Sequence, residues 1–214
     1  MTTRIAAARV SIRAALAGGP ALLLGGPAAA HHAMDGQLPS SFVEGLLSGL
    51  GHPIIGLDHL AFVVAVGLAA AALPRRFLMP LAFVAATVLG VALHLAALDL
   101  PMAEALIALS VVVAGLLLVS GRPIAPPAWL ALFAVAGLLH GYAYGESIVG
   151  AEPAPLYAYL LGFCLVQYAI AAGAMLLVER LAGLPASAPL ATRIAGGVVT
   201  GVGLVFLSEA FLPL

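Results

Sequence analysis

The sequence predicts an all-α integral membrane protein, a bundle of six transmembrane helices preceded by a cleavable signal peptide. Of the 214 residues, 64% are hydrophobic and only 8% are charged, which is a composition solvated mainly by lipid. The apolar stretches reach the length of about 20 residues that a helix needs to cross the hydrocarbon core. They lack the ten-residue alternation of polar and apolar positions that is typical of membrane β-barrels, so helices are predicted throughout.

Residues 1–30 have the pattern of a secretory signal peptide. Three arginines precede a short apolar run, and small residues follow that run up to Ala30. The alternative is an uncleaved first span, but the run is short and is interrupted by glycine and proline. Cleavage after Ala30 leaves a single transmembrane domain, residues 31–214, with His31 and His32 at its new amino terminus outside the cytoplasm.

The mature chain divides into six apolar stretches at its clusters of proline, glycine and arginine. The first stretch is too long for one ordinary span and is interrupted at Gly51, His52 and Pro53. We therefore expect a broken first helix, with the break at Gly51–Pro53. The predicted spans lie near 41–73, 77–98, 102–120, 128–145, 156–178 and 192–212.

The arginines give an orientation for these spans. All five arginines of the mature chain fall on one side of the predicted bundle, at Arg75, Arg76, Arg122, Arg180 and Arg193. Arginine near span ends favours the cytoplasmic side, so the acidic loops and both mature termini are predicted to face the periplasm. The predicted location is the cytoplasmic (inner) membrane of a bacterium.

Ionisable side chains are rare in this chain, yet several of them fall within its predicted spans. His52, Asp58 and His59 lie within eight residues of the first span, and His94 and His140 lie near the predicted outer ends of spans two and four. A charged group at the bilayer centre costs about 2.5–3.5 kcal/mol on insertion scales, so such groups usually face the bundle interior and have a function. For His94, a hydrogen bond to a neighbouring helix remains an equal alternative.

Histidine and carboxylate together suit first-row divalent metals such as nickel, cobalt, zinc and copper. On an unbroken helix His52 and His59 would be about 10.5 Å apart along the axis, too far to share one ion through bonds of about 2 Å. A break at the proline would bend His52 towards Asp58 and His59. Otherwise the two histidines would mark successive positions on a pathway.

Several other classes of function are excluded or disfavoured by composition. A formal net charge of −1 and the absence of lysine argue against nucleic-acid binding. Cys164 is the single cysteine, so no internal disulfide and no cysteine-based cluster can form. A phosphate-binding loop requires a lysine that the chain lacks, so the chain has no ATPase of its own for transport.

Three features of the sequence resemble the HupE/UreJ family of nickel/cobalt permeases. They are the motif H-x5-D-H from His52 to His59, the apolar run after it, and the segment from His140 to Glu146. The resemblance covers most of the mature chain and implies a six-span, non-enzymatic permease. It implies metal-handling roles for His52, Asp58, His59, His140 and Glu146. Many members carry further histidines where this chain has Tyr144 and the pair Gln167–Tyr168, so the resemblance does not decide between nickel and cobalt.

The function predicted from the sequence is import of nickel or cobalt by a secondary permease. The ion is the substrate, the bilayer is the environment, no cofactor is permanently bound, and a homo-oligomer is possible. His31 and His32 are predicted to collect the ion, and His52, Asp58 and His59 to pass it inward with His94 and His140. The alternatives are an intramembrane metalloenzyme built on the same residues and a haem protein with His94 and His140 as axial ligands.

Overall fold

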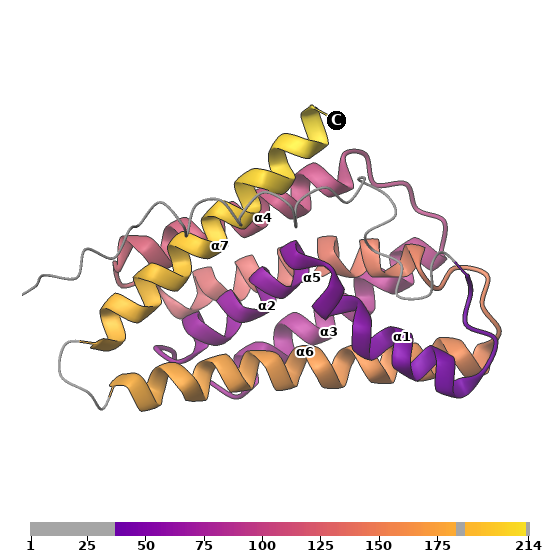
Figure 1. The fold of residues 1–214 in the computed structure, drawn as a ribbon, viewed down its shortest axis with the longest axis horizontal. Coiled ribbons are helices and arrows are strands. Elements are labelled where there is room, and N and C mark those ends of the chain that lie inside the picture. Colours follow the sequence, from indigo (N-terminus) through magenta and orange to yellow (C-terminus); the bar gives the residue numbers. More distant parts are fainter. Residues whose placement is uncertain (1–36, 183–186, 213–214) are drawn as a thin grey trace, which may run out of the picture.

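The structure is a computed structural model that describes residues 37–182 and 187–212. The described residues form seven helices and no strand (Figure 1). The predicted signal peptide, together with His31 and His32, lies outside the described residues. The helices are α1 (Phe42–Ile55), α2 (Leu57–Ala70), α3 (Leu78–Leu95), α4 (Ala103–Ser120), α5 (Pro126–Glu146), α6 (Pro153–Ala182) and α7 (Ser187–Phe211).

The helices α3 to α7 are each long and apolar enough to cross a membrane. The helices α1 and α2 have 14 residues each, which is too short for a span, and they meet at an angle of 80°. Counted as one broken span, this pair makes a sixth candidate. The all-helical prediction is therefore confirmed for the described residues, which hold five or six candidate spans.

The break in the first helix lies at Gly56, so the prediction of a break at Gly51–Pro53 was wrong. The helix α1 continues through Pro53, which lies near its end. A proline there removes only one backbone donor, and the chain leaves the helical conformation three residues later. Gly56 is extended, with ψ of 101°, and a Cβ at this position would lie 2.8 Å from Cδ2 of His59. The close approach to the imidazole favours glycine at the turn, so the break lies at this glycine and not at the proline.

Backbone N–H and C=O groups on both sides of this break have hydrogen-bond partners. The Gly56 N–H donates to the His52 carbonyl at 3.1 Å, and the Gly56 carbonyl accepts from the Leu60 N–H at 2.8 Å. Gly56 thus closes the last turn of α1 and opens the first turn of α2. A bend of this size within a membrane is tolerated because these groups keep partners inside the protein.

Glycines bring three pairs of helices into close contact. Gly49 of α1 packs against the backbone of Tyr159 in α6, Gly141 of α5 against the backbone of Thr87 in α3, and Gly115 of α4 against Thr200 of α7. In each pair a Cβ on the glycine would overlap the neighbouring helix. Small residues at helix contacts are the usual means of close packing in membranes, where lipid removes the hydrophobic drive for association.

The helix α2 is the central element of the bundle (Figure 1). It contacts every other helix, and its Phe62, Val63 and Val66 are fully buried. The arginine-bearing ends gather at one end of the bundle, where Arg76 pairs with Glu179 at 3.0 Å. The fold therefore places the start of α2, with Asp58 and His59, within the bundle, and places the end of α2 towards the arginines.

Candidate metal site at the helix break

The bend at Gly56 brings together the three residues of the H-x5-D-H motif. His52 lies in the last turn of α1, and Asp58 and His59 lie in the first turn of α2. Their exposed fractions are only 1%, 6% and 1%. The ring centroids of His52 and His59 are 5.8 Å apart, whereas a straight helix would separate them by about 10.5 Å along its axis. The break thus makes one shared ion possible for both imidazoles.

His140 of α5 completes a cluster of three imidazoles. Its side chain is fully buried, and its Nδ1 lies 2.7 Å from Nδ1 of His59. Its other ring nitrogen, Nε2, lies 3.1 Å from the hydroxyl of Ser110 in α4. Phe62 packs against the His140 ring with centroids 4.7 Å apart and closes the cluster on the side of α2. Three helices, α2, α4 and α5, therefore contribute to the position of one buried histidine pair.

Two tyrosines, Tyr144 and Tyr159, contact His52. Nδ1 of His52 lies 3.1 Å from the hydroxyl of Tyr159, which in turn donates to the backbone carbonyl of Tyr144 at 2.9 Å. The Tyr144 ring contacts both His52, at 4.9 Å between centroids, and His59, at 4.5 Å. The Tyr144 hydroxyl is buried and has no hydrogen-bond partner among the described residues. The hydroxyl oxygen of Tyr144, which could ligate a metal, is thus enclosed beside the imidazoles.

Asp58 supplies the negative charge of the site. Its Oδ1 accepts a hydrogen bond from the His59 backbone N–H at 2.8 Å and lies 4.0 Å from Nδ1 of His59. The helix α2 has no side-chain cap at Gly56, so its first N–H groups need another acceptor. The carboxylate takes that role, and the positive end of the helix dipole stabilises its charge.

The cluster is not arranged as a formed metal site. Among residues 37–182 and 187–212, no group of three histidine, cysteine or acidic side chains stands in a metal-holding geometry. The hydrogen bond between His59 and His140 is one reason, because an ion between two opposed nitrogens with bonds of about 2 Å would separate them by about 4 Å. Binding through either Nδ1 therefore requires the pair to open.

The other predicted metal residues lie apart or outside the described chain. His94 packs edge-on against Tyr142 at 4.6 Å and against Gly145, five positions beyond His140 on α5. Glu146 is exposed at the end of α5, and its six-residue separation from His140 turns it to a different face of the helix. His31 and His32 lie outside the described residues, so their role stays a prediction.

Sequence reasoning missed Ser110 and Tyr159 as partners of the cluster. Each is buried within an apolar helix, and each contacts a histidine that is at least 30 positions away along the chain. A lone serine amid the apolar residues of α4 was the one available signal for Ser110. For Tyr159 the sequence offered none, because the pairing depends on how α6 packs against α1.

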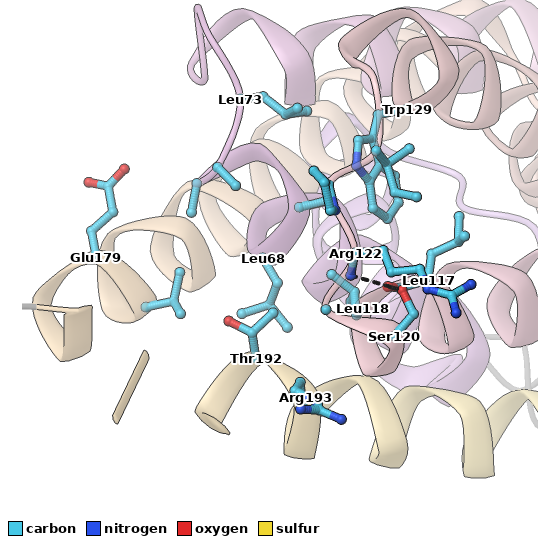
Figure 2. Close-up of a pocket in the computed structure, with 17 residues that line it drawn as sticks. Leu68, Leu73, Leu117, Leu118, Ser120, Arg122, Trp129, Glu179, Thr192 and Arg193 are labelled. Atoms are coloured by element: carbon cyan, nitrogen blue, oxygen red, sulfur yellow. Dashed lines mark hydrogen bonds between the residues drawn. The ribbon is translucent and has the colours of Figure 1, made fainter. Parts of the chain in front are cut away.

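A cavity of about 540 Å³ lies at the other end of α2 (Figure 2). Its walls combine apolar side chains, such as Leu68, Leu73 and Trp129, with Arg122 and Arg193. Between His59 and this cavity α2 carries only apolar residues, most of them buried. The histidine cluster and the cavity thus lie at opposite ends of α2, with apolar residues of that helix between them.

Comparison with known proteins decides the family. The family model described as HupE / UreJ protein matches residues 20–206. The chain belongs to the HupE/UreJ family. It is also 32% identical over 167 residues to Protein HupE of Rhizobium leguminosarum bv. viciae, a match that covers 77% of this chain and 85% of that protein. No solved structure matches the chain.

The HupE/UreJ resemblance read from the sequence is thereby confirmed. In this HupE/UreJ chain, the motif residues His52, Asp58 and His59 lie beside His140, which is 81 positions after His59. Tyr144, the position noted as a departure from other HupE/UreJ members, lies against two of these histidines. The first motif and His140 therefore lie in one buried cluster, whereas Glu146 does not.

Proposed function

We propose that the chain is a secondary permease that imports nickel or cobalt through the cluster formed by His52, Asp58, His59 and His140. The observation that carries the proposal is the burial of three imidazoles and a carboxylate together at a helix break. Buried ionisable groups in a membrane bundle mark ion pathways, and broken helices recur at transporter sites. The HupE/UreJ family is generally one of nickel and cobalt transporters, which favours transport over the metalloenzyme and haem alternatives.

The chemistry of the cluster suits a divalent transition metal. Imidazole nitrogens are good ligands for nickel and cobalt, whereas magnesium and calcium prefer oxygen alone. Asp58 adds a charge that offsets part of the charge of the ion as its water is replaced. The hydrogen bond between His59 and His140 has to open only where Nδ1 of His140 itself becomes a ligand of the ion.

Movement through the protein requires a second change of conformation. The residues of α2 between the cluster and the cavity are apolar, so α2 itself offers an ion no ligand along this stretch. Phe62 packs on both His140, at 4.7 Å, and Phe83, at 5.3 Å, so this aromatic contact must loosen before an ion can leave the cluster along α2. We place the cavity of Figure 2 at the cytoplasmic exit, since the arginines surround it.

The membrane potential supplies enough energy for import. A divalent cation that moves inward gains about 4.6 kcal/mol per 100 mV, which is twice the value for one charge. At about 1.4 kcal/mol per decade, this supports accumulation on the order of 10³-fold. In this scheme both termini face the periplasm of a bacterium, His31, His32 and Glu146 collect the ion, and no cofactor is permanently bound.

Asp58→Asn is expected to reduce uptake of radiolabelled nickel and cobalt into cells to the level of cells that lack the protein. Asparagine keeps the shape and can still accept the hydrogen bond from the His59 N–H, so the variant removes chiefly the charge. Glu209→Gln, near the end of α7, is the matched control and is expected to keep wild-type uptake. Both are compared at equal membrane abundance.

Undiminished uptake by Asp58→Asn would contradict the assignment of the cluster. Uptake of neither metal by the wild-type protein would contradict the permease itself. An absorption spectrum of the same purified protein separates out the haem alternative, because only a haem protein shows a Soret band.

A further inference from the structure

Two chains of hydrogen bonds connect the buried histidines to backbone carbonyl groups. In the first, the Ser110 hydroxyl donates its single proton to the Ile107 carbonyl at 2.7 Å, because a carbonyl oxygen can only accept. The same hydroxyl oxygen lies 3.1 Å from Nε2 of His140 and has no second proton to offer. Nε2 of His140 is therefore the donor in that contact and carries the proton.

The tautomer of His140 determines that of His59. An imidazole that binds a metal is neutral, and a neutral imidazole carries one proton. With its proton on Nε2, His140 accepts through Nδ1. The contact of 2.7 Å between the two Nδ1 atoms then requires His59 to donate from Nδ1. Nε2 of His59 consequently has a lone pair and no proton.

The second chain acts on His52 in the same way. The Tyr159 hydroxyl donates its proton to the Tyr144 carbonyl at 2.9 Å. Its oxygen can only accept in the contact of 3.1 Å with Nδ1 of His52, so that Nδ1 carries the proton. The neutral ring then has its lone pair on Nε2. Two unrelated chains thus produce the same tautomer in His52 and His59.

We propose that Ser110 and Tyr159 are positioning residues that make His59 and His52 present Nε2 to the metal ion. The inference rests on the proposed function and deepens it, because it names the ligating atoms and the residues that prepare them. A metal ligand must offer a lone pair, and the hydrogen bond made by the other ring nitrogen decides which atom that is. Metal can then bind without a prior proton transfer within either ring.

The two series of hydrogen bonds differ in whether they persist when metal binds. His52 can bind through Nε2 while Nδ1 keeps its bond to Tyr159. His59 can do the same while it donates to His140, so in this scheme His140 orients His59 through the contact between their Nδ1 atoms. The bond between His59 and His140 opens only if His140 itself joins the ion. His52 and His59 are therefore the first imidazole ligands, and His140 is the later one.

Nuclear magnetic resonance of the full-length metal-free protein, labelled with ¹⁵N-histidine, tests the tautomers directly. Expected for the wild type is a protonated Nδ1 and an unprotonated Nε2 in both His52 and His59, with the reverse in His140. Ser110→Ala removes the acceptor for His140 and is expected to mix the tautomers of His140 and His59 only. Tyr159→Phe is expected to mix that of His52 only. Resonances are assigned with single histidine variants.

Cobalt binding to the same purified proteins is the second readout. Loss of such a hydrogen-bond partner typically weakens metal affinity about 10- to 100-fold, and this range is expected for both Ser110→Ala and Tyr159→Phe. Ser110→Thr keeps a hydroxyl that can bond a carbonyl in the preceding turn, so it is expected to keep wild-type affinity and tautomers. In uptake assays the loss appears as a higher half-saturating concentration.

A protonated Nε2 on His59 or His52 in the wild-type protein would overturn the inference, and this result does not depend on any variant folding. Wild-type cobalt affinity in both Ser110→Ala and Tyr159→Phe would overturn it as well. These failures are distinct from failure of the proposed function. In that case the wild-type protein transports neither metal, whatever its tautomers are.

Discussion

Replacement of His59 by alanine is expected to abolish uptake of nickel and cobalt in cells at matched membrane abundance. His59 is buried at the break and lies beside His52, Asp58 and His140, so the variant removes one ligand and the partner of another. A remaining cluster with two imidazoles cannot replace the water of the ion as effectively. Transport of radiolabelled metal, corrected for protein in the membrane, measures the effect.

His94→Ala is the matched control for this experiment. His94 is also a membrane histidine, but it packs against Tyr142 and Gly145 near the end of α5. We expect its replacement to change the concentration needed for half-maximal uptake and to leave transport intact. Equal and complete losses in both variants would contradict a site centred on the helix break. Full uptake by His59→Ala would contradict it more strongly.

The second large effect is expected at Gly141, where α5 packs closely against α3. A Cβ on residue 141 would overlap the backbone of Thr87, including its Cα at 2.6 Å, and backbone cannot move aside as a flexible side chain can. Overpacking typically costs about 1–3 kcal/mol and occasionally more. Gly141→Ala also pushes on His140, its neighbour in the chain. Loss of both thermal stability and metal uptake is therefore expected.

Gly201→Ala is the control, and its expected effect on thermal stability has the opposite sign. A Cβ on residue 201 of α7 would meet nothing within 4 Å among the described residues. Alanine favours a helix over glycine by about 1 kcal/mol, so this variant is expected to unfold at the same or a higher temperature. The comparison is made by thermal unfolding in detergent. Equal stability of the two variants would contradict the close contact of α5 with α3.

The sequence was sufficient for the helical class and the residues of the motif. Composition and the lengths of apolar runs depend only on local chemistry, so the helices α3 to α7 could be placed within several residues of their ends. The motif from His52 to His59 was visible because charge is rare in this chain. Family resemblance, now confirmed, connected it to His140.

The position of the break and the partners of the histidines could not be predicted in the same way. Proline is the strongest local breaker, yet Pro53 remains in a helix because Gly56, at a close approach to His59, allows the turn at lower cost. Ser110 and Tyr159 become partners only through packing between distant helices. Such contacts follow from tertiary structure and have no signal in residue spacing.

Influx into liposomes that contain only the purified protein tests the central claim most directly. An inside-negative potential is imposed, and entry of radiolabelled nickel and cobalt is followed for the wild type and for His59→Ala. The account predicts potential-dependent accumulation of at least one of the two metals by the wild type, and none by His59→Ala. Absence of influx for a folded wild-type protein, or equal influx for both proteins, would contradict it.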